Sequence, residues 1–258
     1  MPSLVAGSRV PGIPLASFAP QPCCLLLGFT KLELGKSNIL SRLGVMPPRQ
    51  PRRRSYDQYC ASARALDAVG DRWTLLIVRE LLAGPRRYTD LHADLPGVST
   101  DMLATRLKDM ETQGLATRRR LPPPGAATVY ELTPRGAGLL PVLTALAEWG
   151  APDLAERRPT DAVRAHWFAL PLLRRLPATE GPAVVDVALD EGVFHVRLGG
   201  EGPVYGDGPA EAPDARLVLD ADTCRELGNG TLTVEQGVKA GRIDVLGDGP
   251  VATTLRGA

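Results

Sequence analysis

Residues 88–114, YTDLHADLPGVSTDMLATRLKDMETQG, decide the fold of the first half of this chain. The first part of the stretch predicts a short helix that the Pro96-Gly97 pair closes. Ser99 is a favoured N-cap for a second helix, which Gly114 ends. Apolar residues recur at helical spacing in both: Tyr88, Leu91 and Leu95, then Leu103, Leu107 and Met110. Two helices joined by a tight turn indicate a helix-turn-helix.

The flanking residues extend this unit. Upstream, the apolar spacing in residues 60–82 predicts two helices separated by Gly70. Downstream, the β-like runs 115–121 and 128–132 predict a hairpin, and a long amphipathic helix is expected over 134–149. The order helix, helix, short helix, helix, hairpin, helix is typical of a winged helix-turn-helix.

The second half of the chain changes its period from three or four residues to two. After an expected linker at 151–160 comes a helical run over 162–176. Two runs in which apolar and other residues alternate then flank Asp190-Glu191-Gly192, and this pattern indicates a hairpin. Further strands are expected at 215–219 and 242–246, and short helices at 222–227 and 233–240. The predicted fold class is therefore α+β: a winged helix over 56–150, mostly α with a β-hairpin wing, and a separate α+β domain over 161–258.

Residues 1–55 show no sustained period, and we interpret them as a disordered extension. Their short apolar run CCLLLG comes too late for a signal peptide. Translation starting at Met46 is an alternative reading of this segment. The run Arg52-Arg53-Arg54 has two interpretations of its own: an arm that enters the minor groove of DNA, or a disordered basic tail.

Composition limits the function classes. Of 258 residues, 44% are apolar and 23% charged, as in an ordinary globular protein. The sequence contains no run of about 20 apolar residues, so no membrane span is predicted. Four cysteines fit neither a disulfide framework nor a zinc pattern, so a cytoplasmic protein is expected. Three scattered histidines, with no nucleophile elbow, Walker loop or dinucleotide fingerprint, predict no enzyme, no catalytic residue, no metal and no cofactor.

Charge is unevenly distributed. Residues 1–59 carry eight basic side chains against two acidic ones, whereas residues 177–258 carry six against fourteen. Because phosphate repels acidic surfaces, any contact with double-stranded DNA belongs to the first half of the chain.

Candidate DNA-binding residues lie on the second helix of the helix-turn-helix and on the hairpin. With the apolar face inward, the outer face near the helix start presents Ser99, Thr100, Asp101, Thr105 and Lys108. Hydroxyl and amino groups there suit base edges or phosphates, although any surface helix also shows polar residues.

Arginines supply the remaining candidates. The run Arg118-Arg119-Arg120 begins the hairpin, where it either contacts phosphate or simply protects an edge strand with charge. Arg86 and Arg87, just before the short helix, are phosphate candidates too.

The region resembles the HxlR-type winged-helix regulators. The resemblance is carried by residues 60–82, by Gly84-Pro85-Arg86-Arg87-Tyr88-Thr89-Asp90-Leu91, and by later segments as far as Trp149-Gly150. It implies a homodimer, formed by helices at the two ends of the domain, that binds pseudo-palindromic promoter sites. Two positions depart from the family pattern: Ala61 follows Cys60 where proline is usual, and the wing tip, 125–127, lacks a basic residue. The strand arginines therefore gain importance.

Cys60 has two interpretations. In some relatives the matching cysteine senses oxidants or electrophiles, which requires an activated thiolate, and Arg64 one turn later is a candidate activator. The alternative is inert packing near a dimer-forming helix.

The second half resembles, more faintly, the sterol-carrier-protein-2-like fold, through residues 237–250 with 221–228 and the earlier hairpin. The resemblance implies an apolar cavity for a small ligand, and the alternative is that these residues fill a core. Together these readings predict a sequence-specific, homodimeric transcriptional regulator, a repressor rather than an activator, modulated by a small apolar ligand. The alternative is a lipid or small-molecule binding protein whose winged helix makes protein contacts.

Overall fold

The computed structural model describes residues 55–123, 127–154, 157–200 and 202–257, which all fall in one compact unit, Arg53–Ala258. The extension up to residue 54, with Met46 and Arg52-Arg53-Arg54, and most of the wing tip lie outside the described residues. Within the described ranges, no helix is both long and apolar enough to cross a membrane.

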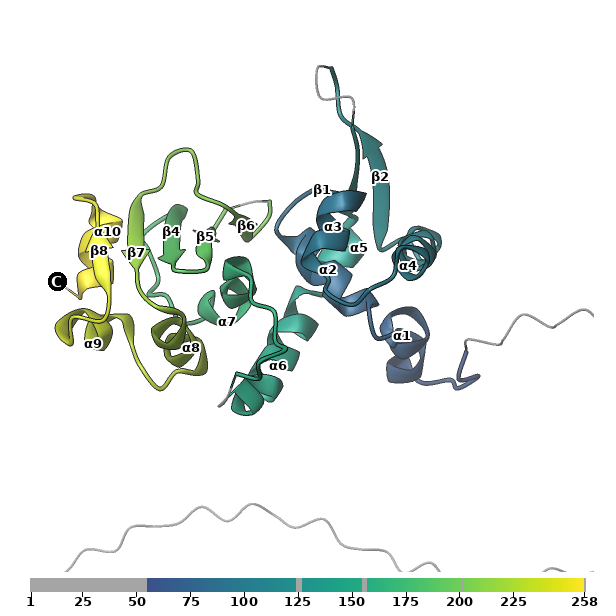
Figure 1. Cartoon of the computed structure of the whole chain (residues 1–258), viewed down its shortest axis with the longest axis horizontal. Coiled ribbons are helices and arrows are strands. Elements are labelled where there is room, and N and C mark those ends of the chain that lie inside the picture. The colour runs from purple at the N-terminus through teal and green to yellow at the C-terminus, as the bar shows by residue number, and fades with distance from the viewer. Residues whose placement is uncertain (1–54, 124–126, 155–156, 201, 258) are drawn as a thin grey trace, which may run out of the picture. The chain divides into compact units, whose positions relative to one another are not determined.

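The predicted winged helix is confirmed (Figure 1). Its elements are α1 Ala61–Val69, α2 Thr74–Leu82, β1 Arg86–Arg87, α3 Tyr88–Asp94, α4 Thr100–Thr112, β2 Ala116–Arg120, β3 Thr128–Leu132, α5 Pro134–Ala137 and α6 Leu140–Gly150. The strands form an antiparallel sheet in the order β1-β3-β2. The wing is therefore anchored through β1 to the start of the helix-turn-helix.

The helix-turn-helix owes its geometry to a few local signals. Ser99 caps α4, since its hydroxyl oxygen accepts a hydrogen bond from the Met102 amide at 3.3 Å. Gly114, at φ +66°, ends the turn after α4 in a conformation that favours glycine. The predicted inward face is confirmed, because Leu103, Leu107 and Met110 are fully buried.

The remaining residues form a mixed sheet with helices, so the predicted α+β content is confirmed. The elements are η2 Ala151–Leu154, η3 Ala165–Phe168, α7 Ala169–Leu172, β4 Ala183–Leu189, β5 Gly192–Leu198, β6 Tyr205–Asp207, β7 Ala215–Val218, α8 Ala221–Asn229, α9 Val234–Lys239, β8 Asp244–Leu246 and α10 Pro250–Arg256. The strand order is β6-β5-β4-β7-β8, with β4 and β7 parallel. The sterol-carrier-protein-2-like identity and the domain boundaries stay predictions.

The predicted long helix at 134–149 was wrong, because it is two helices, α5 and α6. Pro141 lies in the first turn of α6, where its ring would clash with the backbone four residues earlier in a continuous helix. Gly136 also packs α5 tightly, since a Cβ there would lie 2.0 Å from the Leu115 carbonyl oxygen.

The predicted helical run at 162–176 was also too long. Residues 162–164 are not helical, and the Arg164 side chain instead reaches Asp94 and the Ala93 carbonyl oxygen in the winged helix. The short strands β1 and β6 and the last helix α10 were not predicted. A strand of two or three residues is too short to show a period.

Candidate nucleic-acid interface

The start of α4 is fixed by two hydrogen bonds and faces solvent. Besides the Ser99 cap, the Tyr88 hydroxyl of α3 donates to the Thr100 carbonyl oxygen at 2.7 Å. Ser99 itself is exposed, and its hydroxyl proton is not used by the cap. A helix N-terminus with exposed donors is a suitable contact for an anion.

The polar residues predicted on the outer face of α4 all lie there. Thr100, Asp101, Thr105 and Lys108 are exposed, while the opposite face is buried. The Thr105 hydroxyl donates to the Asp101 carbonyl oxygen at 2.7 Å, which holds this side chain close to the helix backbone. The arrangement presents hydrogen-bonding groups on a rigid support, as groove recognition needs.

The wing arginines are exposed as well. Arg118 Nε lies 2.8 Å from Glu111 Oε1 of α4, and Arg119 Nε lies 3.0 Å from Glu131 Oε2 of β3. Arg120 is also exposed. Surface ion pairs of this kind contribute about 0–1 kcal/mol, so a phosphate can replace the carboxylate at little cost.

Arg86 and Arg87 are adjacent in sequence but differ in environment. Arg87 is exposed at the N-cap of α3. The Arg86 side chain is only 15% exposed, and its Nη1 lies 3.1 Å from Asp207 Oδ2 of β6 and 3.9 Å from Asp94 Oδ2. The structure therefore separates Arg86 from the exposed candidates.

Cys60 is exposed directly before α1. Hydrogen bonds from the backbone amides of Ala63 and Ser62 lower the pKa of its thiol. The backbone amides at the start of α1 therefore favour the thiolate. Arg64, the predicted activator, lies 3.8 Å from Asp67, and its activation of Cys60 stays a prediction.

A buried charged cluster next to the winged helix was missed by the sequence analysis. Its centre is Glu80 of α2, whose carboxylate is fully buried. Oε2 lies 2.7 Å from His166 Nε2, and Oε1 accepts from the Trp167 indole at 2.9 Å and pairs with Arg79 at 2.7 Å. The available signal was a carboxylate inside the apolar helix TLLIVRELL, since a buried charge needs partners.

His166 is held between two carboxylates. Its Nε2 faces Glu80, and its Nδ1 lies 3.4 Å from Asp207 Oδ1. Burial opposes the charge, but the hydrogen bonds to Asp207 and Glu80 raise the pKa of His166 to about 9. The hydrogen bond with His166 in turn holds the pKa of Asp207 well below its usual range. His166 is therefore an imidazolium at neutral pH.

Three of these groups, Glu80, Asp94 and His166, have ligand atoms within 4.8 Å of one another, close enough to hold a metal ion. However, Arg79 pairs with Glu80, and Arg164 Nε lies 3.1 Å from Asp94. Guanidinium groups repel a cation and already neutralise these carboxylates. The arrangement favours an ion-pair network over a metal centre.

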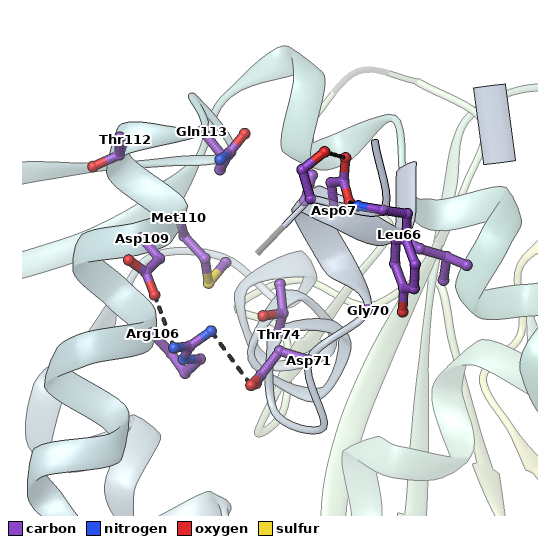
Figure 2. Close-up of a pocket in the computed structure, with 13 residues that line it drawn as sticks. Leu66, Asp67, Gly70, Asp71, Thr74, Arg106, Asp109, Met110, Thr112 and Gln113 are labelled. Atoms are coloured by element: carbon purple, nitrogen blue, oxygen red, sulfur yellow. Dashed lines mark hydrogen bonds and ion pairs between the residues drawn. The ribbon is translucent and has the colours of Figure 1, made fainter. Parts of the chain in front are cut away.

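A polar pocket of about 490 Å³ lies between residues 55–56, α1, α2 and α4 (Figure 2). Arg106 spans it, with Nη1 3.3 Å from Asp71 and Nη2 2.9 Å from Asp109. Its lining does not suit the apolar ligand predicted from the sequence.

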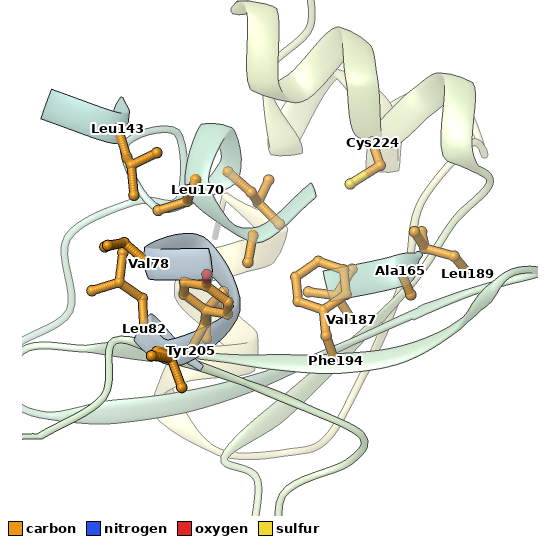
Figure 3. Close-up of a cluster of buried hydrophobic side chains, with 14 of the residues drawn as sticks. Val78, Leu82, Leu143, Ala165, Leu170, Val187, Leu189, Phe194, Tyr205 and Cys224 are labelled. Carbon is orange, nitrogen blue, oxygen red and sulfur yellow. The ribbon is translucent and has the colours of Figure 1, made fainter. Parts of the chain in front are cut away.

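The space expected to hold that ligand, between the sheet and helices of residues 161–258, contains packed side chains (Figure 3). Phe194 and Cys224 are fully buried there, whereas Tyr205, also fully buried, lies beside Val78 and Leu82 of α2, where its hydroxyl donates to the Arg79 carbonyl oxygen. A second opening of about 490 Å³ lies at the surface, lined by Leu173, Leu176 and residues 177–179, 181–182 and 198–200. The ligand stays a prediction.

Comparison with known proteins matches the winged helix. A family model described as HxlR-like helix-turn-helix matches residues 68–158. The uncharacterized HTH-type transcriptional regulator YvaP of Bacillus subtilis is 36% identical over 86 residues, covering 33% of this chain and 80% of YvaP. The HTH-type transcriptional regulator YodB of B. subtilis is 34% identical over 85 residues, covering 33% of this chain and 76% of YodB.

The solved structure of reduced YodB aligns with 39% of this chain and 100% of that chain, at 29% identity and a TM-score of 0.34. The relatives are transcriptional regulators and not enzymes, as the sequence predicts. Residues 159–258 lie outside the family match.

Proposed function

This chain belongs to the HxlR-like helix-turn-helix family of DNA-binding transcriptional regulators, and from that premise we propose that it is a homodimeric repressor that reads DNA with α4 and the wing. One observation carries the proposal. The apolar face of α4 is fully buried while its polar face is exposed, beside three exposed arginines on β2. A recognition helix and a flanking phosphate contact require this combination.

The exposed residues divide by the part of DNA that they suit. Ser99, at the start of α4, suits a phosphate, and Thr100, Thr105 and Lys108 suit base edges or phosphates. Asp101 suits the amino group of cytosine. The arginines before and after α4 in the sequence suit the phosphate backbone. These are Arg87 before α3, and Arg118, Arg119 and Arg120 on the wing.

An exposed apolar stripe supports the dimer. On α6, Val142, Leu146 and Trp149 follow helical spacing and are 44%, 44% and 81% exposed. On α1, Leu66 is 50% exposed. These are helices at the two ends of the winged helix, and such a stripe is suited to a second copy of the chain. We expect Leu146→Asp to convert a dimer to a monomer in sedimentation equilibrium, with Leu154→Asp, outside both helices, as the control.

Repression is the simpler mode of action. A dimer bound across a promoter excludes polymerase without needing a contact with it, whereas activation requires one. Expression of a reporter placed behind the promoter upstream of this gene is expected to rise when the gene is deleted. A fall on deletion would identify an activator.

DNA binding itself is tested by fluorescence anisotropy on the native upstream duplex, beside a scrambled duplex, across a salt series. We expect tighter binding to the native duplex and a loss of about 0.9 log unit of affinity per contacted phosphate for each log unit of salt. Equal binding to both duplexes would move the operator elsewhere. No binding to either duplex at low salt would favour a small-molecule binding protein whose winged helix makes protein contacts.

A small apolar ligand is part of the proposal, and the opening near Leu173, Leu176 and Leu198 supports it. An apolar fluorophore such as an anilinonaphthalene sulfonate, titrated into the folded protein, tests this opening. Loss of fluorophore binding in Leu198→Asp, but not in Leu246→Asp, would locate the binding site at this opening.

Redox or electrophile sensing at Cys60 is a second candidate activity, favoured by its exposure and lowered pKa. Alkylation of the thiol is expected to change DNA affinity in the wild type and not in Cys60→Ser. Buried Cys224 is the internal control, because burial raises its pKa to about 12 and makes it unreactive.

A further inference from the structure

One contact joins the basic face of the winged helix to the acidic part of the chain. Asp207, at the end of β6, lies 3.1 Å from the Arg86 Nη1 of β1. On its other oxygen, Asp207 lies 3.4 Å from His166, which is in turn 2.7 Å from buried Glu80 of α2. Asp207 is therefore not a freely moving surface carboxylate, because two elements of the chain fix it beside Arg86.

The pairing leaves Arg86 incompletely satisfied. Its Nη1 has Asp207 and, at 3.9 Å, Asp94. Its Nη2 is buried with no hydrogen-bond partner among the described residues. An unpartnered buried donor is unfavourable, so a ligand that engages both nitrogens competes well. A phosphate offers that bidentate contact to a guanidinium.

The register of the sheet places Arg86 with the wing. Arg86 pairs with Tyr130 of β3, and Tyr130 pairs on its other side with Arg118 of β2. Residues in one row of a sheet project to the same face. Arg86 and Arg118 therefore share a face of the same sheet, yet Arg118 is 59% exposed and Arg86 only 15%.

We propose that Asp207 is an autoinhibitory contact that withholds one phosphate-binding arginine, Arg86, from DNA in each subunit. The inference rests on the proposed function and specifies its regulation. Separation of β6 from β1 frees the guanidinium and strengthens DNA binding. Any event that moves residues 161–258 away from α2 and β1 then controls affinity electrostatically, with no change in α4.

The experiment compares full-length wild type, Asp207→Asn and Asp222→Asn in anisotropy titrations on the native upstream duplex. Asp222 is the control, because it lies in the acidic part, is 83% exposed and pairs with Arg225 of its own helix. Both substitutions remove one negative charge, so a change in net charge alone does not distinguish them.

We expect Asp207→Asn to raise affinity about fivefold and to steepen the salt slope by about 0.9 per subunit, while Asp222→Asn matches wild type. Asp207→Ala, which cannot accept a hydrogen bond, is expected to show at least the same gain. In the double variant Arg86→Gln/Asp207→Asn the gain disappears. Thermal unfolding of each variant confirms that the folded protein is titrated.

The possible outcomes separate the two proposals. If wild type binds DNA but both Asp207 variants bind like Asp222→Asn or more weakly, the autoinhibitory contact is overturned and the DNA-binding proposal stands. A gain that persists in the double variant would also overturn it, because Arg86 would not be its source. If neither wild type nor an Asp207 variant binds DNA, both proposals fail together.

Discussion

The wing and the region around Glu80 use the same residue types in opposite ways. On the wing, Arg118 is 59% exposed and pairs with Glu111 at 2.8 Å. Around α2, Arg79 is 18% exposed and pairs with the fully buried Glu80 at 2.7 Å. The distances hardly differ, but burial decides the consequence. An exposed pair exchanges its carboxylate for phosphate at little cost, whereas a buried carboxylate depends on every partner that it has.

The largest effect is expected from Glu80→Ala. The substitution leaves the His166 imidazolium and the Trp167 indole without their buried acceptor, so the free energy of unfolding should fall by about 3–5 kcal/mol. Denaturant titration measures this loss.

The exposed counterpart is Glu111→Ala, which removes only the partner of Arg118. A loss within about 1 kcal/mol is expected there. Equal losses in the two variants would show that burial does not separate the two regions.

The next effect is a pH dependence centred on His166. Its pKa in the folded protein, about 9, exceeds the ordinary 6.5, so the folded state binds this proton more tightly. The stabilisation is therefore complete below about pH 6.5 and is lost as the pH rises through 9. The shift corresponds to on the order of 3 kcal/mol, because neutral imidazole would face Glu80 and Asp207 with only one N–H.

The check is the free energy of unfolding at several pH values between 6.5 and 9.5. Wild type should lose stability across this window, and His166→Gln, which has no titrating ring, should lose less. Parallel profiles for the two proteins would place the titration elsewhere.

Local signals made the helix-turn-helix predictable, whereas contacts between distant residues were not. Ser99 and Gly114 mark the two ends of α4 in the sequence. In the structure Ser99 is the N-cap, and Gly114 follows the last turn of the helix at positive φ. Proline at 141 was equally visible, but the apolar period across 134–149 concealed the break that it causes. His166 and Glu80 are 86 positions apart, and no local pattern pairs them.

The site itself was predicted in part for the same reason. Exposure of Lys108 follows from the helix period, which a sequence displays, whereas Arg118, Arg119 and Arg120 are all exposed whichever way strand alternation turns them. The different environment of Arg86 follows from β6, a three-residue strand at the edge of a distant sheet. Which of two adjacent arginines is exposed is a tertiary property.

A smaller effect is expected from removing the three wing arginines. In Arg118→Ala/Arg119→Ala/Arg120→Ala, DNA affinity should fall about 10- to 100-fold and the salt slope should flatten by about 0.9 for each lost phosphate contact. Anisotropy in a salt series measures both quantities.

The control removes three exposed arginines outside the wing: Arg157, Arg158 and Arg174, which are 64%, 80% and 61% exposed. The net charge changes equally, so only a local contact distinguishes the two triple variants. A similar loss in both would indicate general electrostatic attraction instead of a wing contact.

The smallest effect is expected from removing a helix N-cap, either in the winged helix or in the acidic part of the chain. Ser99 caps α4 through the Met102 amide at 3.3 Å, and Asp220 caps α8 through the Thr223 amide at 2.6 Å. Ser99→Ala and Asp220→Ala should each lower the free energy of unfolding by about 1 kcal/mol. Only Ser99→Ala should also weaken DNA binding, because its hydroxyl and the start of α4 are the proposed phosphate contact. Loss of DNA affinity in both variants, in proportion to stability, would mean that the Ser99 hydroxyl acts only as a cap.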